Sequence, residues 1–142
     1  MSEAGKDVVR RAWAAYDAGD EAAFAACVTS DWREHDPVGS VATIADANAS
    51  MRAQRGAFRK QTEIVQIVAE GDIVAARSVT RSTHVGRYLD VEPTGRVLEL
   101  HQVLFNRIAG GRIAETWQVT GSPGLYTQLT GRAAPGRRDN QS

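Results

Sequence analysis

The chain has a single cysteine, no excess of charge of either sign and no long apolar run. Because Cys27 is the only cysteine among 142 residues, the chain can form neither an internal disulfide nor a metal site with two thiolates. Seventeen basic side chains balance seventeen acidic ones, which leaves no overall positive field to attract nucleic acid or an anionic membrane. We therefore expect no nucleic-acid or membrane partner and predict a small molecule instead.

Sequence signals for export or membrane insertion are also missing. The stretch MSEAGKDVVR lacks the apolar core of a signal peptide, and no run approaches the ~18 apolar residues needed to span a bilayer. Cys27 lies among alanines, as small buried residues often do, and one unpaired thiol suits a reducing compartment. We predict a cytoplasmic protein.

The motifs of common cofactor and nucleophile sites are absent. No glycines form GxGxxG or GxxxxGK[ST], and no serine lies in a GxSxG elbow. His35, His84 and His101 have no zinc-binding spacing. We expect no cofactor and no metal, so that any chemistry is left to carboxylates, histidines and tyrosines acting as acids and bases.

The composition fits one domain, with helices first and strands later. A period of about 3.6 predicts three helices: residues 3–17, the short stretch DEAAFAACV, and a stretch that begins at Ser40 or Thr43 and reaches Phe58. Asn48 is predicted to share the apolar face of the third helix, where it needs either a backbone partner or a polar cavity.

From Thr62 onward the period shifts toward two. The stretch TEIVQIVAEGDIVAARSVTRSTH predicts a hairpin with its turn at Gly71-Asp72, and VLELHQVLFNRI with RIAETWQVT predicts a second hairpin. Three helices followed by an antiparallel sheet of four or more strands indicate an α+β domain over residues 1–131. The polar end of the chain, residues 132–142, is expected to be a flexible tail.

Two residues of the second hairpin are candidate acids or bases. Strict alternation places Glu115 on the apolar face with Ile113 and Trp117, where it is either a partly desolvated carboxylate with a raised pKa or a structural hydrogen-bonding group at the sheet edge. His101 lies in the middle of its strand. It is either a base or a half-exposed histidine, because both faces of that strand are half apolar.

The segment WREHDP combines four ionisable side chains behind an aromatic ring. His35 and Asp36 are adjacent, so in an extended chain they point to opposite sides and only one of them faces a pocket. Asp36 is a candidate for that role. The alternative is that its carboxylate binds nearby backbone N–H groups in an Asx-type turn beside Pro37.

Several segments together resemble a known family. AAYDAGD, DWREHDP, AEGDIVAAR, THVGRYLDVEPTGR and GGRIAETWQVTGSPGLYTQL are similar, in order and spacing, to the SnoaL-like polyketide cyclases of the NTF2-like superfamily over residues 6–131. The resemblance implies a cone-shaped α+β barrel, in which a curved antiparallel sheet wraps around three N-terminal helices and leaves one deep pocket. It also implies homodimers that pair through the sheet and a reaction that needs no metal or cofactor.

The resemblance leaves the reaction open. Family cyclases close a ring by an aldol reaction with an aspartate near the end of the last strand, and the matching position here is Gly121. Similar enzymes that open epoxides use a pair of acidic residues, for which Asp36 and Glu63 are the candidates. A non-catalytic ligand-binding or dimerisation module is the third alternative.

The residues expected to form the site follow from these readings. The predicted catalytic residues are Asp36, His35, Glu63, His101 and Glu115, and the predicted substrate-binding residues are Tyr16, Trp32, Asn48, Met51 and Trp117. The predicted function is a cofactor-independent cyclase that acts by general acid/base catalysis on a small, apolar, oxygenated molecule.

Overall fold

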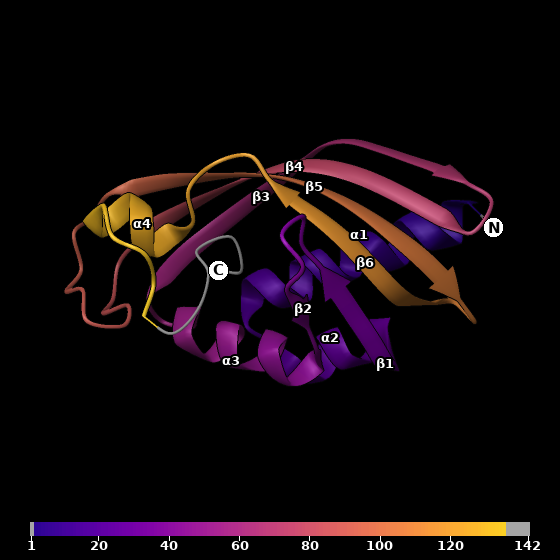
Figure 1. The fold of residues 1–142 in the computed structure, drawn as a ribbon, viewed down its shortest axis with the longest axis horizontal. Helices are drawn as coiled ribbons and strands as arrows, with labels where there is room; N and C mark the ends of the chain where they lie inside the picture. The colour runs from indigo at the N-terminus through magenta and orange to yellow at the C-terminus, as the bar shows by residue number, and fades with distance from the viewer. Residues whose placement is uncertain (1, 136–142) are drawn as a thin grey trace.

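The computed structural model of the protein describes residues 2–135. One six-stranded sheet arches over three helices, and a fourth short helix lies at one end of the sheet (Figure 1). The helices are α1 (Ser2–Ala18), α2 (Glu21–Cys27), α3 (Ile44–Gln54) and α4 (Leu125–Thr130). The strands are β1 (Val28–His35), β2 (Val41–Ala42), β3 (Phe58–Glu70), β4 (Ile73–His84), β5 (Val97–Ala109) and β6 (Arg112–Thr120). This architecture confirms the predicted α+β class and the curved sheet over three N-terminal helices.

The sheet contains a strand that periodicity did not predict. Its order is β2-β1-β6-β5-β4-β3, and β1 pairs with β6 in parallel, so the sheet is mixed rather than wholly antiparallel. β1 contains most of WREHDP, with Arg33 opposite Glu115 and His35 opposite Trp117. Four charged or ionisable residues in a row give little strand signal of their own. The pairing with β6, which lies far along the chain, as in Arg33 opposite Glu115, holds this segment extended.

The third helix begins and ends for local reasons. The Thr43 hydroxyl accepts a hydrogen bond from the Asp46 N–H, and the Asp46 carboxylate accepts one from the Thr43 N–H, which completes a capping box. Gly56, with a φ of 79°, follows the end of the helix, and Phe58 already belongs to β3. The predicted helix was therefore four residues too long, and α4 was not predicted.

The buried side chains form two clusters under the sheet. The larger one joins α1 to β1, β4 and β6 and includes Val8, Val9, Trp13, Phe24, Val28, Trp32, Met51 and Ile113. The smaller one joins α4 to the start of β3 and includes Phe58, Tyr88, Leu98, Leu125, Tyr126 and Ala134. Ala134 belongs to the predicted C-terminal tail, and residues 136–142 of that tail lie outside the described residues.

The two long hairpins decide which side chains face the helices. On β5 the even-numbered residues, such as Leu98, Leu100 and Asn106, are buried, while Val97, Val103 and Phe105 are exposed on the outer face.

No helix among residues 2–135 is both long enough and apolar enough to cross a membrane.

Candidate functional site

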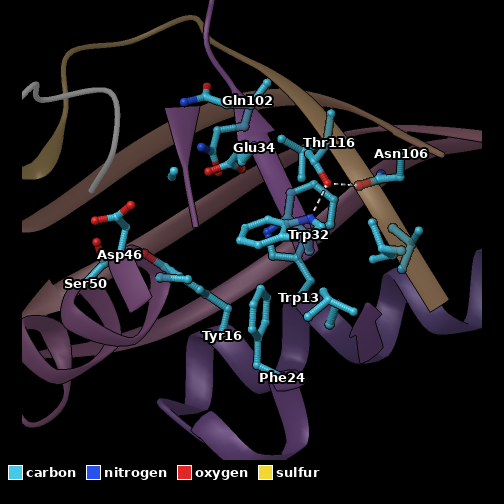
Figure 2. A pocket seen from close by; sticks show the side chains of 18 residues that line it. Trp13, Tyr16, Phe24, Trp32, Glu34, Asp46, Ser50, Gln102, Asn106 and Thr116 are labelled. Atoms are coloured by element: carbon cyan, nitrogen blue, oxygen red, sulfur yellow. Dashed lines mark hydrogen bonds between the residues drawn. The ribbon is translucent and has the colours of Figure 1, made fainter. Parts of the chain in front are cut away.

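A cavity of about 100 Å³ lies between the helices and the inner face of the sheet, which is room for several water molecules or a small organic group. Side chains from α1, α2, α3, β1, β5 and β6 contribute to it (Figure 2). Its apolar wall consists of Val9, Ala12, Trp13, Phe24, Val28, Trp32, Ala42, Ala47, Leu104 and Ile113. Its polar groups come from Tyr16, Glu34, Asp46, Ser50, Gln102, Asn106, Thr116 and Gln118. We call this cavity the pocket.

The alternation of β1 places one acid in the pocket. Trp32 and Glu34 point inward and line the pocket, whereas Arg33 is exposed and His35 points to the outer face of the sheet. Figure 2 shows Glu34 projecting from β1 above the Trp32 ring. A strand turns every second side chain to the same face, so the inward position of Trp32 determines that of Glu34.

The environment of Glu34 favours its protonated form. Burial raises the pKa of this carboxyl to about 7, and the negative charge of Asp36 adds to the effect. Glu34 is therefore partly protonated at neutral pH. A carboxyl group in that state can both accept and donate a proton.

Asp36 is buried, with 9% of its surface exposed, but it serves the turn that follows β1. Its carboxylate accepts hydrogen bonds from the backbone N–H groups of Val38 (3.1 Å) and Ser40 (2.8 Å). This is the Asx-type turn that the sequence left as the alternative. Asp36 is not among the residues that line the pocket, although its charge acts on Glu34.

Asp46 is the second carboxylate at the pocket. It accepts hydrogen bonds from both the N–H (2.9 Å) and the hydroxyl (3.2 Å) of Thr43 at the start of α3. An acidic side chain at the positive end of a helix stabilises the helix. Asp46 therefore holds the helix end, while Glu34 has no such ionic or capping partner among the hydrogen bonds described for residues 2–135.

A chain of buried hydrogen bonds fixes one wall of the pocket. The Trp32 indole N–H donates to the Thr116 hydroxyl (3.0 Å), and Thr116 donates to the Asn106 carbonyl oxygen (2.9 Å). The Asn106 amide N–H donates in turn to the Val74 carbonyl (3.2 Å). Each donor has an acceptor, so the orientations of the indole, the hydroxyl and the amide are all determined.

A second polar chain lies further along β5 and β6. The Gln102 amide donates to the Thr120 hydroxyl (3.3 Å), and that hydroxyl donates to the Gln118 carbonyl oxygen (2.8 Å). Gln102 and Gln118 both line the pocket. Their amides give an otherwise apolar cavity groups that can bind substrate oxygen atoms.

None of the five predicted catalytic residues lines the pocket, and besides Asp36 the other four lie on the outer face of the sheet. His35 and Glu115 bind each other on the outer face (2.7 Å), and His101 is exposed there, bound to Glu99 (3.2 Å). Glu63 is exposed on β3, and the expected acidic pair of Asp36 and Glu63 is not formed. These side chains come from β1, β3, β5 and β6, and each points away from the helices.

The prediction that Glu115 and Trp117 lie on the same face of β6 as Ile113 was wrong. Ile113 faces inward, but Glu115, Trp117 and Val119 lie on the outer face, and Thr116 and Gln118 are the buried residues. An irregularity in the pairing with β5, between Arg107 and Ile108, shifts the alternation by one residue. The sequence analysis assumed strict alternation without a bulge, and it therefore predicted that Ile113 and Trp117 lie on the same face.

The outer position also changes the electrostatics of Glu115. Its hydrogen bond to His35 is the largest cause that lowers its pKa, and the Arg107 guanidinium acts in the same direction. A raised pKa was one of the two alternatives predicted for Glu115, and the pKa is lowered instead. Trp117 stacks on the His35 ring, with centroids 5.7 Å apart, and is not among the residues that line the pocket.

The predicted substrate-binding residues divide in the same way. Tyr16 and Trp32 line the pocket, and Met51 is packed in the larger core cluster. Asn48 lies on α3 outside the pocket wall, and its side-chain oxygen is buried without a hydrogen-bond partner among residues 2–135. Gly121 follows β6, and a Cβ built there would lie 3.8 Å from the His101 carbonyl oxygen, beside the outer face.

Glu34 and Asp46 are the pocket carboxyl residues that the sequence analysis did not select. Glu34 lies between Trp32 and Asp36, which were both candidates for the site and are two residues away on either side. Extending that alternation would have placed Glu34 between them on the inner face. Within residues 2–135, no three His, Cys, Asp or Glu side chains lie together in a way that could hold a metal ion.

Comparisons with known proteins agree on the fold. The family model for SnoaL-like polyketide cyclase matches residues 6–129. AclR from Streptomyces galilaeus, a proposed hydroxylase, is 27% identical with a TM-score of 0.78, and the match covers 93% of this chain and 85% of AclR. IdmH from Streptomyces antibioticus, a proposed polyketide cyclase, is 25% identical with a TM-score of 0.71, and the match covers 82% of this chain and 91% of IdmH. Among proteins with curated descriptions, none matches the chain at a significant level.

Proposed function

The chain belongs to the SnoaL-like polyketide cyclase family, and on this basis we propose that it is a cofactor-independent cyclase in which Glu34 is the general acid and base. The observation that carries the proposal is the place of Glu34: an ionisable carboxyl in an apolar pocket, with a pKa raised to about 7 by burial. The proposed substrate is a small, largely apolar molecule that carries several carbonyl groups.

Ring closure by an aldol reaction needs one group that moves a proton twice. In the proposed step, the Glu34 carboxylate removes a proton from the carbon between two substrate carbonyls, and the resulting enolate forms a carbon–carbon bond to a third carbonyl. Protonated Glu34 then returns the proton to the new alkoxide. A carboxyl with a pKa near the working pH suits both transfers. The Gln102 and Gln118 amides supply polar contacts for the substrate oxygens.

The test compares Glu34→Gln with Glu63→Gln, which removes an exposed carboxylate on β3. Both proteins are incubated with a panel of apolar poly-β-ketones, and products are followed by mass spectrometry, since aldol closure keeps the mass or loses one water. We expect Glu34→Gln to lower the rate by about 10²-fold or more and Glu63→Gln to leave it unchanged. Equal rates for wild type and Glu34→Gln would exclude Glu34 as the acid and base.

Epoxide opening is a second candidate, and one observation favours it. Burial, and in addition the negative charge of Asp36, raises the pKa of Glu34, which favours the protonated form of this carboxyl. A protonated carboxyl can donate to the departing epoxide oxygen. A panel of apolar epoxides distinguishes this reaction, because hydrolysis adds one water to the mass. Binding of both panels without any turnover would support a ligand-binding module instead.

We also propose that two copies pair through the outer face of the sheet. Val103 faces Val119 and Phe105 faces Trp117 across β5 and β6, and all four side chains are exposed. Charged groups of both signs flank this apolar strip: Arg77, Arg81, Glu99, Arg107 and Glu115. In a symmetric pairing, the basic groups of one copy can meet the acidic groups of the other.

A further inference from the structure

A second group of polar side chains lies beside the pocket, between α3 and the start of β3. Lys60 and Ser82 are directly paired across β3 and β4, and both point to the helices. The Lys60 ammonium donates a hydrogen bond to the side-chain oxygen of Gln54, the last residue of α3. The Lys60 ammonium therefore lies beside the Gln54 amide, and the residue paired with Lys60 on β4 carries the buried Ser82 hydroxyl.

The group has more hydrogen-bond donors than acceptors. The Gln54 amide nitrogen and the Ser82 hydroxyl have no hydrogen-bond partner among residues 2–135, although Gln54 is only 5% exposed and Ser82 is 0% exposed. Lys60 has three N–H donors, and the single hydrogen bond described for it goes to Gln54. A buried donor without an acceptor destabilises the protein, so an acceptor that fits here is bound favourably.

The charge of Lys60 is also without a contact partner of opposite sign. It forms no ion pair within the described part of the chain, and its ammonium lies 5.3 Å from the centre of the Tyr16 ring. Asp17 acts on it electrostatically, but the Asp17 carboxylate is bound to the Thr62 hydroxyl. Burial lowers the pKa of Lys60 to about 8, as expected for a cation that lacks a contacting anion.

Two routes connect this group to the pocket. On α3, Ser50 lines the pocket and Gln54 follows one helical turn later on the same face. On the sheet, pocket residue Gln102 is paired with Ser78, whose buried hydroxyl also has no partner among residues 2–135. The Tyr16 ring contacts both sides, since it lines the pocket and faces Lys60.

We propose that Lys60, Gln54 and Ser82 form an oxyanion-binding subsite, which takes a carboxylate or enolate oxygen of a ligand whose apolar part occupies the pocket. This inference rests on the proposed function and deepens it, because it assigns the substrate of the proposed cyclase an anionic oxygen that binds outside the residues lining the pocket. Such an oxygen would accept hydrogen bonds from all three side chains and would neutralise the buried ammonium.

The test measures binding rather than turnover. Benzoate and benzamide have the same ring, but only benzoate offers an anionic acceptor. Each is titrated at pH 7 into ¹⁵N-labelled protein, with the side-chain amide signals of Gln54 as the reporter. We expect benzoate to bind at least about tenfold more tightly than benzamide, since hydrogen bonds to charged groups are worth 1.5–3 kcal/mol.

Three variants test the assignment. Lys60→Met should abolish the preference for benzoate, whereas Arg59→Met, which removes a charge from the exposed neighbour on β3, should keep it. Ser82→Ala removes a hydroxyl that has no partner, so it should leave the free energy of unfolding unchanged and lower the preference several-fold. Ser82→Ala therefore keeps the test decisive if Lys60→Met does not fold.

Two results would overturn the subsite. One is equal binding of benzoate and benzamide by the wild type, which would mean that these donors serve only water. The other is a preference that survives in both Lys60→Met and Ser82→Ala. Glu34→Gln separates this inference from the proposed function, because it should abolish turnover and keep the preference for benzoate.

Discussion

Trp32 and Thr116 lie 84 positions apart in the chain and are joined by a hydrogen bond of 3.0 Å from the indole N–H to the hydroxyl. This bond connects β1 to β6 at the one place where the sheet is parallel. Trp32 is 4% exposed and Thr116 is 3% exposed, so water cannot replace either partner. The pair thereby holds the strand that carries Glu34 against the strand that carries the pocket residue Gln118.

Thr116→Val should destabilise the protein without changing its shape. Valine has nearly the volume of threonine, but it leaves the Trp32 N–H without an acceptor and the Asn106 carbonyl oxygen without this donor. We expect the free energy of unfolding to fall by about 1–3 kcal/mol in urea denaturation. Thr83→Val, on the half-buried outer side of β4, is the control and should change it by less than about 0.5 kcal/mol. Similar values for the two variants would contradict the role given to Thr116.

The raised pKa of Glu34 makes stability depend on pH. The folded state binds this proton more tightly than the unfolded state, because the pKa rises from 4.5 to about 7 on folding. The resulting stabilisation is fully present below pH 4.5 and is lost as the pH rises through about 7. When the free energy of unfolding is measured at several pH values between 5 and 8.5, that of the wild type should therefore fall more steeply with pH than that of Glu34→Gln.

The expected size of this effect is bounded. The rise of the Glu34 pKa from 4.5 to about 7 corresponds to at most about 3.4 kcal/mol, and contact with the cavity reduces it. Between pH 5 and pH 8.5 the wild type should lose stability relative to Glu34→Gln, which lacks the titrating group. A difference between the two proteins that stays constant over this range would show that Glu34 titrates normally.

Thr43→Ala should destabilise α3 at its first turn. The change removes one half of the capping box with Asp46 and should lower the free energy of unfolding by about 1 kcal/mol. Ser40→Ala is the matched control. Its side chain was the other candidate cap in the sequence, but in the structure the Ser40 backbone binds Asp36 and α3 begins after Thr43. A larger loss for Ser40→Ala than for Thr43→Ala would contradict this assignment.

Val119→Lys should separate the two copies of the proposed dimer. Val119 is 52% exposed in the apolar strip of the outer face, so a lysine there costs the monomer little and places two cations in a symmetric interface. Light scattering after size exclusion should give a dimer mass for the wild type and a monomer mass for Val119→Lys. Val38→Lys, on an exposed turn away from the strip, should stay dimeric. A monomeric wild type at all concentrations would refute the pairing.

The α+β class, the three N-terminal helices and the two long hairpins could be predicted from the sequence because they depend on short-range signals. Helical spacing in residues 3–17 and the turn at Gly71-Asp72 act within a few residues. The order of motifs over nearly the whole chain predicted the family, and the match of the family model to residues 6–129 confirms it.

Only the tertiary structure decided which side chains form the pocket. β1 is a strand because β6 pairs with it. In β6 an irregularity in the pairing with β5 shifts the inward and outward alternation of side chains by one residue. Local periodicity therefore predicted neither the existence of β1 nor the inward face of β6. These two long-range pairings turned Glu34, Thr116 and Gln118 inward and His35, Glu115 and Trp117 outward. The sequence by itself determined most of the helices and strands, through local hydrogen bonding and apolar spacing. The neighbouring strands decided which side chains of β1 and β6 point to the pocket, since a shift of one residue exchanges the two faces of a sheet.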